Sequence, residues 1–200
     1  MQTSELPQSF RSSVRVVFSA RMGILAFLNV LFFVSALLTI FLERLLFPPV
    51  FYGSWSPWPF GLLPNNFLLV FIVIFLFNLT FASFLTVTLP GILFFPLSGV
   101  ALMYKAVLWG LLLYPVSGNM LLATLPTLFL EGEAYVLSAG AGTVAGASWL
   151  IHKRLYRGEM LSRREAFKRG MNECLRLYLL IGLLLLIAAF VETTTLMLLT

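Results

Sequence analysis

The chain has 200 residues, of which 60% are hydrophobic and only 10% are charged. Soluble domains carry roughly 25% charged residues, so this composition, with a mean hydropathy of +0.98, excludes an ordinary soluble enzyme or binding domain. It predicts an all-α polytopic membrane helical bundle, and the length leaves room for about five transmembrane spans of roughly 20 residues. The single cysteine excludes an intramolecular disulfide.

The formal net charge is +5, and most of the 13 basic residues fall into two clusters. Three arginines precede the first apolar run, eight basic residues lie within 152–176, and only Arg44 and Lys105 lie elsewhere. Basic residues collect on the cytoplasmic side of membrane proteins. We therefore expect a multi-pass cell-membrane protein whose basic clusters face the cytoplasm and the lipid headgroups, and no nucleic-acid partner.

Residues 1–22 are predicted to form a polar cytoplasmic N-terminal tail, and residues 23–198 a single transmembrane domain. The first span begins at Gly23 and ends before Glu43. The following segment, 45–66, contains five prolines and two tryptophans. Prolines at this density prevent a continuous helix, and aromatic rings suit the membrane boundary, so we expect an outer aromatic and proline-rich loop.

The second and third spans are expected over 67–89 and 92–114. Pro90-Gly91 between them predicts a tight turn on the inner side. After the third span, the apolar stretch 120–151 would form a helix of about 48 Å, too long to cross the membrane upright. Because it contains Pro126 and two glutamates, we predict a broken or re-entrant fourth element whose irregular backbone is buried in protein.

The basic cytoplasmic segment, 152–176, contains the sequence Ser162-Arg163-Arg164-Glu165, which is typical of a capping box that opens a helix. The fifth span is expected over 177–198. Five spans place the N-terminus in the cytoplasm and the C-terminus outside. Both basic clusters then lie on the cytoplasmic side, which agrees with the charge distribution.

Polar side chains from several spans are expected at similar depths, roughly 9–16 Å below the outer surface. Charged groups in hydrocarbon are costly and find partners, so we expect a lysine paired with one or more glutamates. Two neighbouring carboxylates do not both ionise easily, so at least one should keep a proton or hold a cation. Structural glue, a transport site and a partner interface all remain open for this intramembrane polar site, which comprises Asn78, Lys105, Glu131, Glu133 and Glu192.

Small residues recur every four positions after the two central glutamates. On a helix they share one face and let another backbone approach closely. The spacing predicts helix packing, either within the chain or between two copies in a homo-oligomer. The residues are Ala134, Ser138, Gly142 and Gly146, with a similar pair at Ala106 and Gly110 in the third span.

Catalytic motifs are not found in the sequence. The single histidine, His152, lies in the basic flank, so a zinc site is not expected. A nucleophile motif and a P-loop are both lacking. We therefore expect a non-enzymatic protein that holds no cofactor and no metal.

Several of these residues carry a family resemblance. Glu131, Ala134, Gly142 and Gly146 match a glutamate, an alanine and spaced glycines of the stage II sporulation protein M family, although Glu133 stands where the family usually has proline. Other matching features are Asn78, Gly91-Ile92, Ala106 with Gly110, and the segment Leu186-Ile187-Ala188-Ala189-Phe190-Val191-Glu192. The chain resembles this family over residues 67–198.

The resemblance implies a five-span bundle with a cytoplasmic N-terminus. It also implies a function, because the founding member is associated with a septal peptidoglycan-degrading complex as a membrane scaffold. We therefore expect a non-enzymatic scaffold or partner-binding subunit of a membrane or cell-envelope complex. The alternative is a transporter or channel subunit that uses the membrane-embedded glutamates.

Overall fold

The computed structural model describes residues 5–46, 66–113, 118–156 and 159–199. The predicted outer loop, 45–66, lies almost entirely outside this part of the chain. The described residues are helical and contain no strand, which confirms the all-α prediction for them. In chain order the elements are α1 (Glu5–Leu46), α2 (Phe67–Leu76), η2 (Phe77–Thr88), α3 (Leu89–Leu93), α4 (Pro96–Leu113), α5 (Gly118–Leu150), α6 (His152–Leu155) and α7 (Arg163–Leu199).

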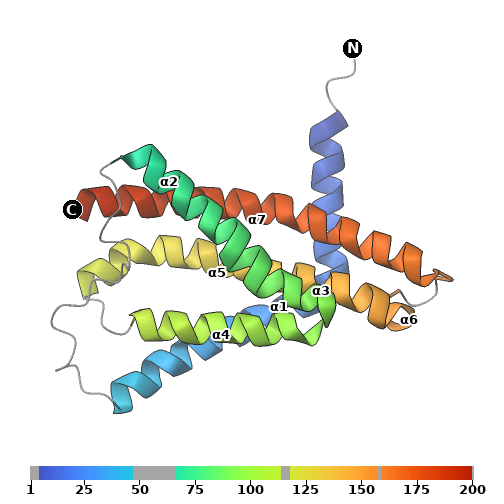
Figure 1. Ribbon diagram of the computed structural model, residues 1–200, viewed down its shortest axis with the longest axis horizontal. Helices are drawn as coiled ribbons and strands as arrows, with labels where there is room; N and C mark the ends of the chain where they lie inside the picture. Colours follow the sequence, from blue (N-terminus) through green and yellow to red (C-terminus); the bar gives the residue numbers. More distant parts are fainter. Residues whose placement is uncertain (1–4, 47–65, 114–117, 157–158, 200) are drawn as a thin grey trace.

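The long helices form a bundle (Figure 1). Within the described residues, four stretches are long and apolar enough to cross a membrane, namely Arg21–Leu46, Phe67–Leu93, Pro96–Leu113 and Arg163–Leu198. α5 runs along the same axis among them (Figure 1). Because successive long segments alternate in direction, the turn after α3, the short helix α6 and the start of α7 gather at one end of the bundle. The C-terminus lies at the other end (Figure 1).

Residues 5–22, within the segment predicted as a polar tail, are helical. α1 begins at Glu5 and continues to Leu46. Pro7 falls in the first turn, where a missing backbone N–H loses no hydrogen bond, and the chain has no other proline or glycine before Gly23. The N-terminal part of α1 stands steeply away from the bundle, whereas the rest of α1 lies along it (Figure 1).

The fourth long element is one continuous helix, so the predicted break or re-entrant turn is wrong. α5 is 33 residues long and keeps Pro126 in its interior. It packs against α1, α3, α4, η2 and α7, and nearly every side chain from Glu131 to Ser148 is buried. Packed neighbours allow a membrane helix to tolerate a proline. Protein, rather than lipid, therefore surrounds the glutamates and small residues that suggested a break.

The second long segment contains an uncommon π-helix. η2 is 12 residues long, and π-helical hydrogen bonds join residues five apart, which widens each turn. The helix then continues through Pro90 and Gly91, where the sequence predicts a tight turn, and α3 ends at Leu93. Pro90 therefore lies inside a continuous helical stretch, where its missing backbone N–H removes one helical hydrogen bond shortly before the helix ends.

The glycines of α5 make close contacts within the chain. A Cβ atom added at Gly142 would lie 2.6 Å from the carbonyl oxygen of Thr88, and one at Gly146 would collide with the carbonyl oxygen of Gly91. Both contacts bring the backbone of α5 against the end of η2 and the start of α3. The row of small residues on α5 therefore packs against helices of the same chain. This removes the reason to expect a second copy at this surface.

The other small residues are also at helix contacts. Ala134 and Ser138 of α5 are fully buried, as is Ala106 of α4. A Cβ atom added at Gly110 of α4 would lie 2.9 Å from the carbonyl oxygen of Ala36 in α1. Small side chains thus hold α4 on α1 and α5 on its neighbours at short distances.

α7 begins at the predicted capping box. The backbone N–H of Ser162 donates to Glu165 Oε2 at 2.8 Å, and the backbone N–H of Glu165 donates to Ser162 Oγ at 3.3 Å. The helix then runs for 37 residues to Leu199. The second half of the basic segment 152–176 is therefore the first part of α7, rather than a separate segment before the last span.

A matched pair of substitutions tests the packing of α5. We expect Gly142→Ala to lower the free energy of unfolding by about 1–3 kcal/mol, because the added methyl group overpacks the contact with Thr88. Gly182→Ala on α7 is the control, since a Cβ atom there meets nothing within 4 Å. Reversible unfolding in mixed micelles measures both variants. Equal stability of the two variants would contradict the close contact.

Candidate functional site

A chain of hydrogen bonds links buried polar side chains in the half of the bundle away from α6. Asn78 Nδ2 of η2 donates to Glu131 Oε1 of α5 at 2.7 Å, and the Tyr135 hydroxyl donates to Asn78 Oδ1 at 3.0 Å. Relative exposure is 9% for Asn78, 8% for Glu131 and 2% for Tyr135. The Asn78 amide therefore uses both its donor and its acceptor inside the bundle, and fixes η2 against α5.

Glu192 of α7 adds a second carboxyl group beside Glu131, so that the two acidic side chains interact. Two adjacent carboxylates do not both ionise easily in a low-dielectric site. The cluster therefore draws side chains from η2, α5 and α7.

Lys105 of α4 supplies the opposite charge. Its Nζ lies 5.4 Å from the centroid of the Tyr135 ring, a cation–π distance, and it interacts electrostatically with Glu131. The lysine thus lies near carboxyl groups of opposite charge. Charged side chains inside a membrane are best tolerated when they have such partners.

Glu133 does not join these side chains. Its Oε2 accepts a hydrogen bond from Asn29 Nδ2 of α1 at 3.4 Å. Residues two apart on a helix do not face each other, so Glu131 and Glu133 point to different neighbours. The structure thus brings together four of the five polar residues named from the sequence, namely Asn78, Lys105, Glu131 and Glu192.

Tyr135 belongs to the cluster but does not stand out in the sequence, because a tyrosine in an apolar segment is common. It is four residues after Glu131, and residues at that spacing share a helix face. That spacing is the signal from which it could have been found. The ring also stacks edge-on against Trp109 of α4, with a centroid distance of 5.8 Å.

A second row of polar contacts lies further along α5. Ser83 Oγ and Ser138 Oγ are 2.5 Å apart, and Thr88 Oγ1 donates to the Ser138 carbonyl oxygen at 2.9 Å. Thr88 Oγ1 is also 2.7 Å from the hydroxyl of Tyr178 in α7. Asn78, Ser83 and Thr88 are spaced five residues apart. The π-helix turns all three toward α5, whereas an α-helix would spread them around its circumference.

A third cluster lies at the end of the bundle that carries α6. Arg21 Nε is 3.2 Å from Glu173 Oε2, and the Tyr156 hydroxyl donates to Glu173 Oε1 at 3.3 Å. The guanidinium groups of Arg21 and Arg169 lie 5.4 and 4.8 Å from the Tyr156 ring centroid. Burial, reinforced by the Glu173 charge, raises the pKa of Tyr156 to about 12. This cluster ties α1, the chain after α6 and α7 together.

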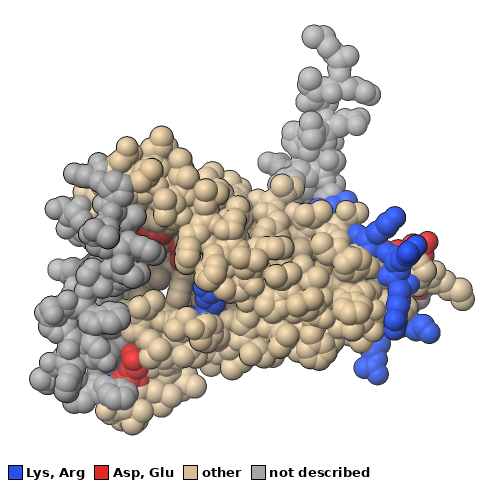
Figure 2. Space-filling view, in the orientation of Figure 1, with Lys and Arg blue, Asp and Glu red and all other residues tan. Residues whose placement is uncertain are grey.

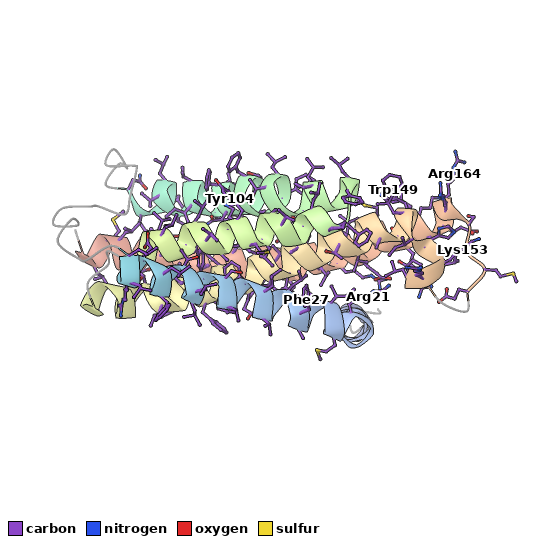
Figure 3. All side chains as sticks on the ribbon, turned by 90° about the horizontal axis from the view of Figure 1, so that it is seen from below. Arg21, Phe27, Tyr104, Trp149, Lys153 and Arg164 are labelled. Atoms are coloured by element: carbon purple, nitrogen blue, oxygen red, sulfur yellow. The ribbon has the colours of Figure 1, made fainter. Side chains whose placement is uncertain are left out.

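Basic side chains gather at this same end (Figure 2). Arg21, Lys153 and Arg164 all lie near it, and Trp149 lies beside them (Figure 3). Trp149 Nε1 donates to the Ile92 carbonyl oxygen at 2.9 Å, which fixes the end of α5 against α3. His152, the single histidine, begins α6 at this end. Among the described residues, His, Cys, Asp and Glu do not form any group of three that could hold a metal ion.

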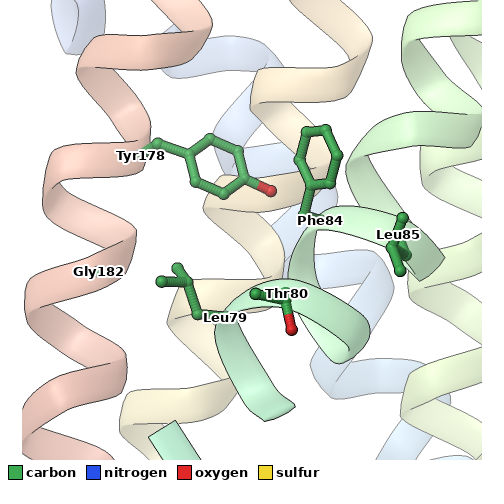
Figure 4. Close-up of a pocket in the computed structure, with 6 residues that line it drawn as sticks. All are labelled: Leu79, Thr80, Phe84, Leu85, Tyr178 and Gly182. Atoms are coloured by element: carbon green, nitrogen blue, oxygen red, sulfur yellow. The ribbon is translucent and has the colours of Figure 1, made fainter. Parts of the chain in front are cut away.

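A pocket of about 410 Å³ lies between η2 and α7 and is separate from the polar cluster (Figure 4). Most of its lining is apolar, and it contains no charged side chain. The hydroxyl of Tyr178, at its edge, points into the second polar row. The lining residues are Leu79, Thr80, Phe84, Leu85, Tyr178 and Gly182.

Comparison with known protein families identifies the family of this chain. The family model described as stage II sporulation protein M matches residues 30–195. The chain belongs to the stage II sporulation protein M family. The match includes all four clustered polar residues and both glycines of α5 that contact η2 and α3, and the family and the apolar helices together make this a membrane protein. The corresponding searches of curated proteins and of solved structures give no match.

The two hydrogen bonds of Asn78 predict that its substitution destabilises the bundle. We expect Asn78→Leu to lower the free energy of unfolding by about 1–3 kcal/mol, because the Glu131 and Tyr135 groups lose a buried partner. Asn29→Leu is the matched control, since it removes the longer bond to Glu133 on the opposite side of α5. Unfolding in micelles compares the two. A larger loss for Asn29→Leu would show that the cluster does not stabilise the bundle.

Proposed function

We propose that the protein crosses the membrane five times, with α5 as the additional span, the N-terminus in the cytoplasm and the C-terminus outside. α5 is not among the four stretches apolar enough to cross by composition, and it carries two glutamates and many small residues. A helix enclosed by other helices does not need an apolar surface, since it faces protein instead of lipid. The positive-inside rule supports the orientation, because the basic side chains gather at the end where Arg21 lies.

The function that this arrangement supports best is a non-enzymatic scaffold, a subunit that binds another protein within the membrane. The glycine contacts at Gly142 and Gly146 leave no space between α5 and the backbone at Thr88 and Gly91. This close packing separates the cluster of Asn78, Lys105, Glu131 and Glu192 from the basic end of the bundle. A rigid, closed core favours a platform over a transporter, which needs a site that opens alternately to both sides.

The proposal of a partner protein rests on Tyr104. It lies midway along α4, and its side chain is 62% exposed on the lateral surface of the bundle (Figure 3). Transfer of a hydroxyl from water into hydrocarbon without a hydrogen bond costs several kcal/mol, roughly 4–8. A tyrosine of the membrane boundary avoids this cost, but a residue in the middle of α4 is about 13 Å from either helix end. A partner helix that offers a hydrogen-bond group would satisfy it.

Site-specific photocrosslinking tests the proposed partner contact. The photoreactive residue p-benzoylphenylalanine is introduced at Tyr104 and, as a control, at Phe27 of α1, whose exposure of 64% is nearly the same. We expect irradiation of native membranes to give a discrete heteromeric adduct from position 104 and none from position 27. Lipid adducts of the monomer from both positions would contradict the proposal.

Proteoliposome flux provides a second test. A closed scaffold should not raise proton or monovalent-cation flux above that of protein-free liposomes, because the contact between α5 and α3 interrupts the polar residues. Glu131→Gln and Glu133→Gln serve as a matched pair on the same helix. Flux that is lost in the first variant and kept in the second would overturn the scaffold and favour the transporter.

A further inference from the structure

The pocket between η2 and α7 opens on the lateral surface of the bundle, the side that faces lipid. Three of its lining residues, Thr80, Phe84 and Leu85, are exposed side chains of η2. The rings of Phe84 and Tyr178 meet edge-on with centroids 5.9 Å apart, and they bound the pocket on the side toward α6 (Figure 4). A molecule that fills this pocket must therefore enter it from within the bilayer.

The π-helix supplies one wall of this pocket. Residues five apart share a face in a π-helix. Leu79 and Phe84 therefore form one row along η2, and Thr80 and Leu85 form a second row beside it. π-helical turns are rare and occur frequently at functional sites, so this wall is a feature that packing alone does not require.

Gly182 keeps the opposite wall of the pocket, on α7, open. A Cβ atom added at Gly182 meets no atom within 4 Å, whereas one added at Gly142 or Gly170 would clash with a neighbouring helix. Glycine inside a helix is less stable than alanine, and close packing, which accounts for the other two glycines, does not account for this one. An occupant from outside the chain does account for the space.

The lining of the pocket suits a hydrocarbon chain. It contains no charged residue, and both of its hydroxyl groups are already engaged. Thr80 Oγ1 donates to the Leu76 carbonyl oxygen at 2.6 Å, and the Tyr178 hydroxyl is 2.7 Å from Thr88 Oγ1. A polar ligand would lose its hydration here without gaining a partner, which is unfavourable.

The face of α7 that lines the pocket becomes basic toward α6. Arg164 is 18 residues before Gly182, which is five full helical turns, and Lys168 is 14 residues before it. Both therefore lie on nearly the same face of this continuous helix as Gly182. The face between them is apolar, with Leu175 59% exposed and Met171 partly exposed. An apolar track thus leads from the pocket to two cations.

The charges at the basic end favour a negative ligand. Arg164 and Lys168 are exposed, and neither forms an ion pair with a described residue. Glu165, one turn before Lys168, is held by Ser162 in the capping box. The other two acidic residues of this end, Glu159 and Glu173, are in ion pairs. Basic residues that remain available beside a membrane attract anionic lipids.

The length of the track identifies the occupant. By helix rise, Gly182 is about 21 Å from Lys168 and about 25 Å from Leu199, whereas one leaflet with its headgroups is about 20–22 Å thick. The pocket therefore lies near the middle of the bilayer, where acyl chains end, and the cations lie at headgroup level.

We propose that this track binds one phospholipid with an anionic headgroup, from the leaflet next to the basic end. The phosphate accepts hydrogen bonds from Lys168 and Arg164, and the end of one acyl chain fills the pocket at Gly182. This inference does not depend on whether the bundle acts as a scaffold.

Two phospholipids that differ in headgroup charge give the first test. The full chain is purified in micelles that contain equal amounts of phosphatidylglycerol and phosphatidylcholine with the same acyl chains, and retained lipids are counted by native mass spectrometry. We expect phosphatidylglycerol to be enriched roughly fivefold or more. Equal retention of the two lipids would overturn the proposal.

A matched pair of double variants locates the headgroup. Arg164→Gln with Lys168→Gln should abolish the enrichment. Lys153→Gln with Arg154→Gln removes the same charge from exposed positions of α6 at the same end, and should keep it. An equal loss in both double variants would show a diffuse attraction by the whole basic end and would overturn the site.

A phosphatidylglycerol with a photoreactive diazirine at the end of one acyl chain tests the pocket. Adducts of the unmodified chain should map to residues 79–85 and 178–182. Gly182→Trp fills the space and should remove these adducts, whereas Gly23→Trp, at another glycine with no atom within 4 Å, should keep them. Adducts spread evenly over the lateral helices, or unchanged in Gly182→Trp, would contradict the proposal. A dimer without adducts would instead assign the pocket to a second copy.

Discussion

The enclosure of α5 is the constraint on which the rest of the structure depends. Its glutamates cannot face hydrocarbon without cost, so other helices cover it from Glu131 to Ser148. The glycines make that cover possible because they let η2 and α3 approach to backbone contact. The polar side chains then meet partners from three directions, and a helix unsuited to lipid becomes the centre of a stable bundle.

The sequence supports much of this arrangement. Its composition predicts the all-α membrane class, and helix rise places Asn78, Lys105, Glu131 and Glu192 at similar depths, where the structure brings them together. The prediction of a break in the fourth element is wrong for a physical reason. Great length, Pro126 and two glutamates are compatible either with a broken helix or with a whole helix enclosed by protein, and composition alone does not distinguish these cases.

Other features depend on geometry that α-helical periodicity does not contain. The five-residue spacing of Asn78, Ser83 and Thr88 has no common face on an α-helix, and the π-helix η2 alone turns all three toward α5. The sequence also predicts that Glu133 belongs to the polar site, because Glu133 is only two residues from Glu131. A separation of two residues directs it instead toward Asn29 of α1.

The two polar rows along α5 differ in how completely they are satisfied. In the row nearer α6, the hydroxyls of Ser83, Thr88 and Ser138 all have hydrogen-bond partners, so this half contributes rigidity. In the half away from α6, buried atoms of Glu192 and Thr127 have no partner among the described residues, although an apolar side chain at either position would avoid the cost. A bundle that needed only structural glue would have no use for unsatisfied groups there. The half of the bundle away from α6 is therefore where a ligand or partner has the most to contribute.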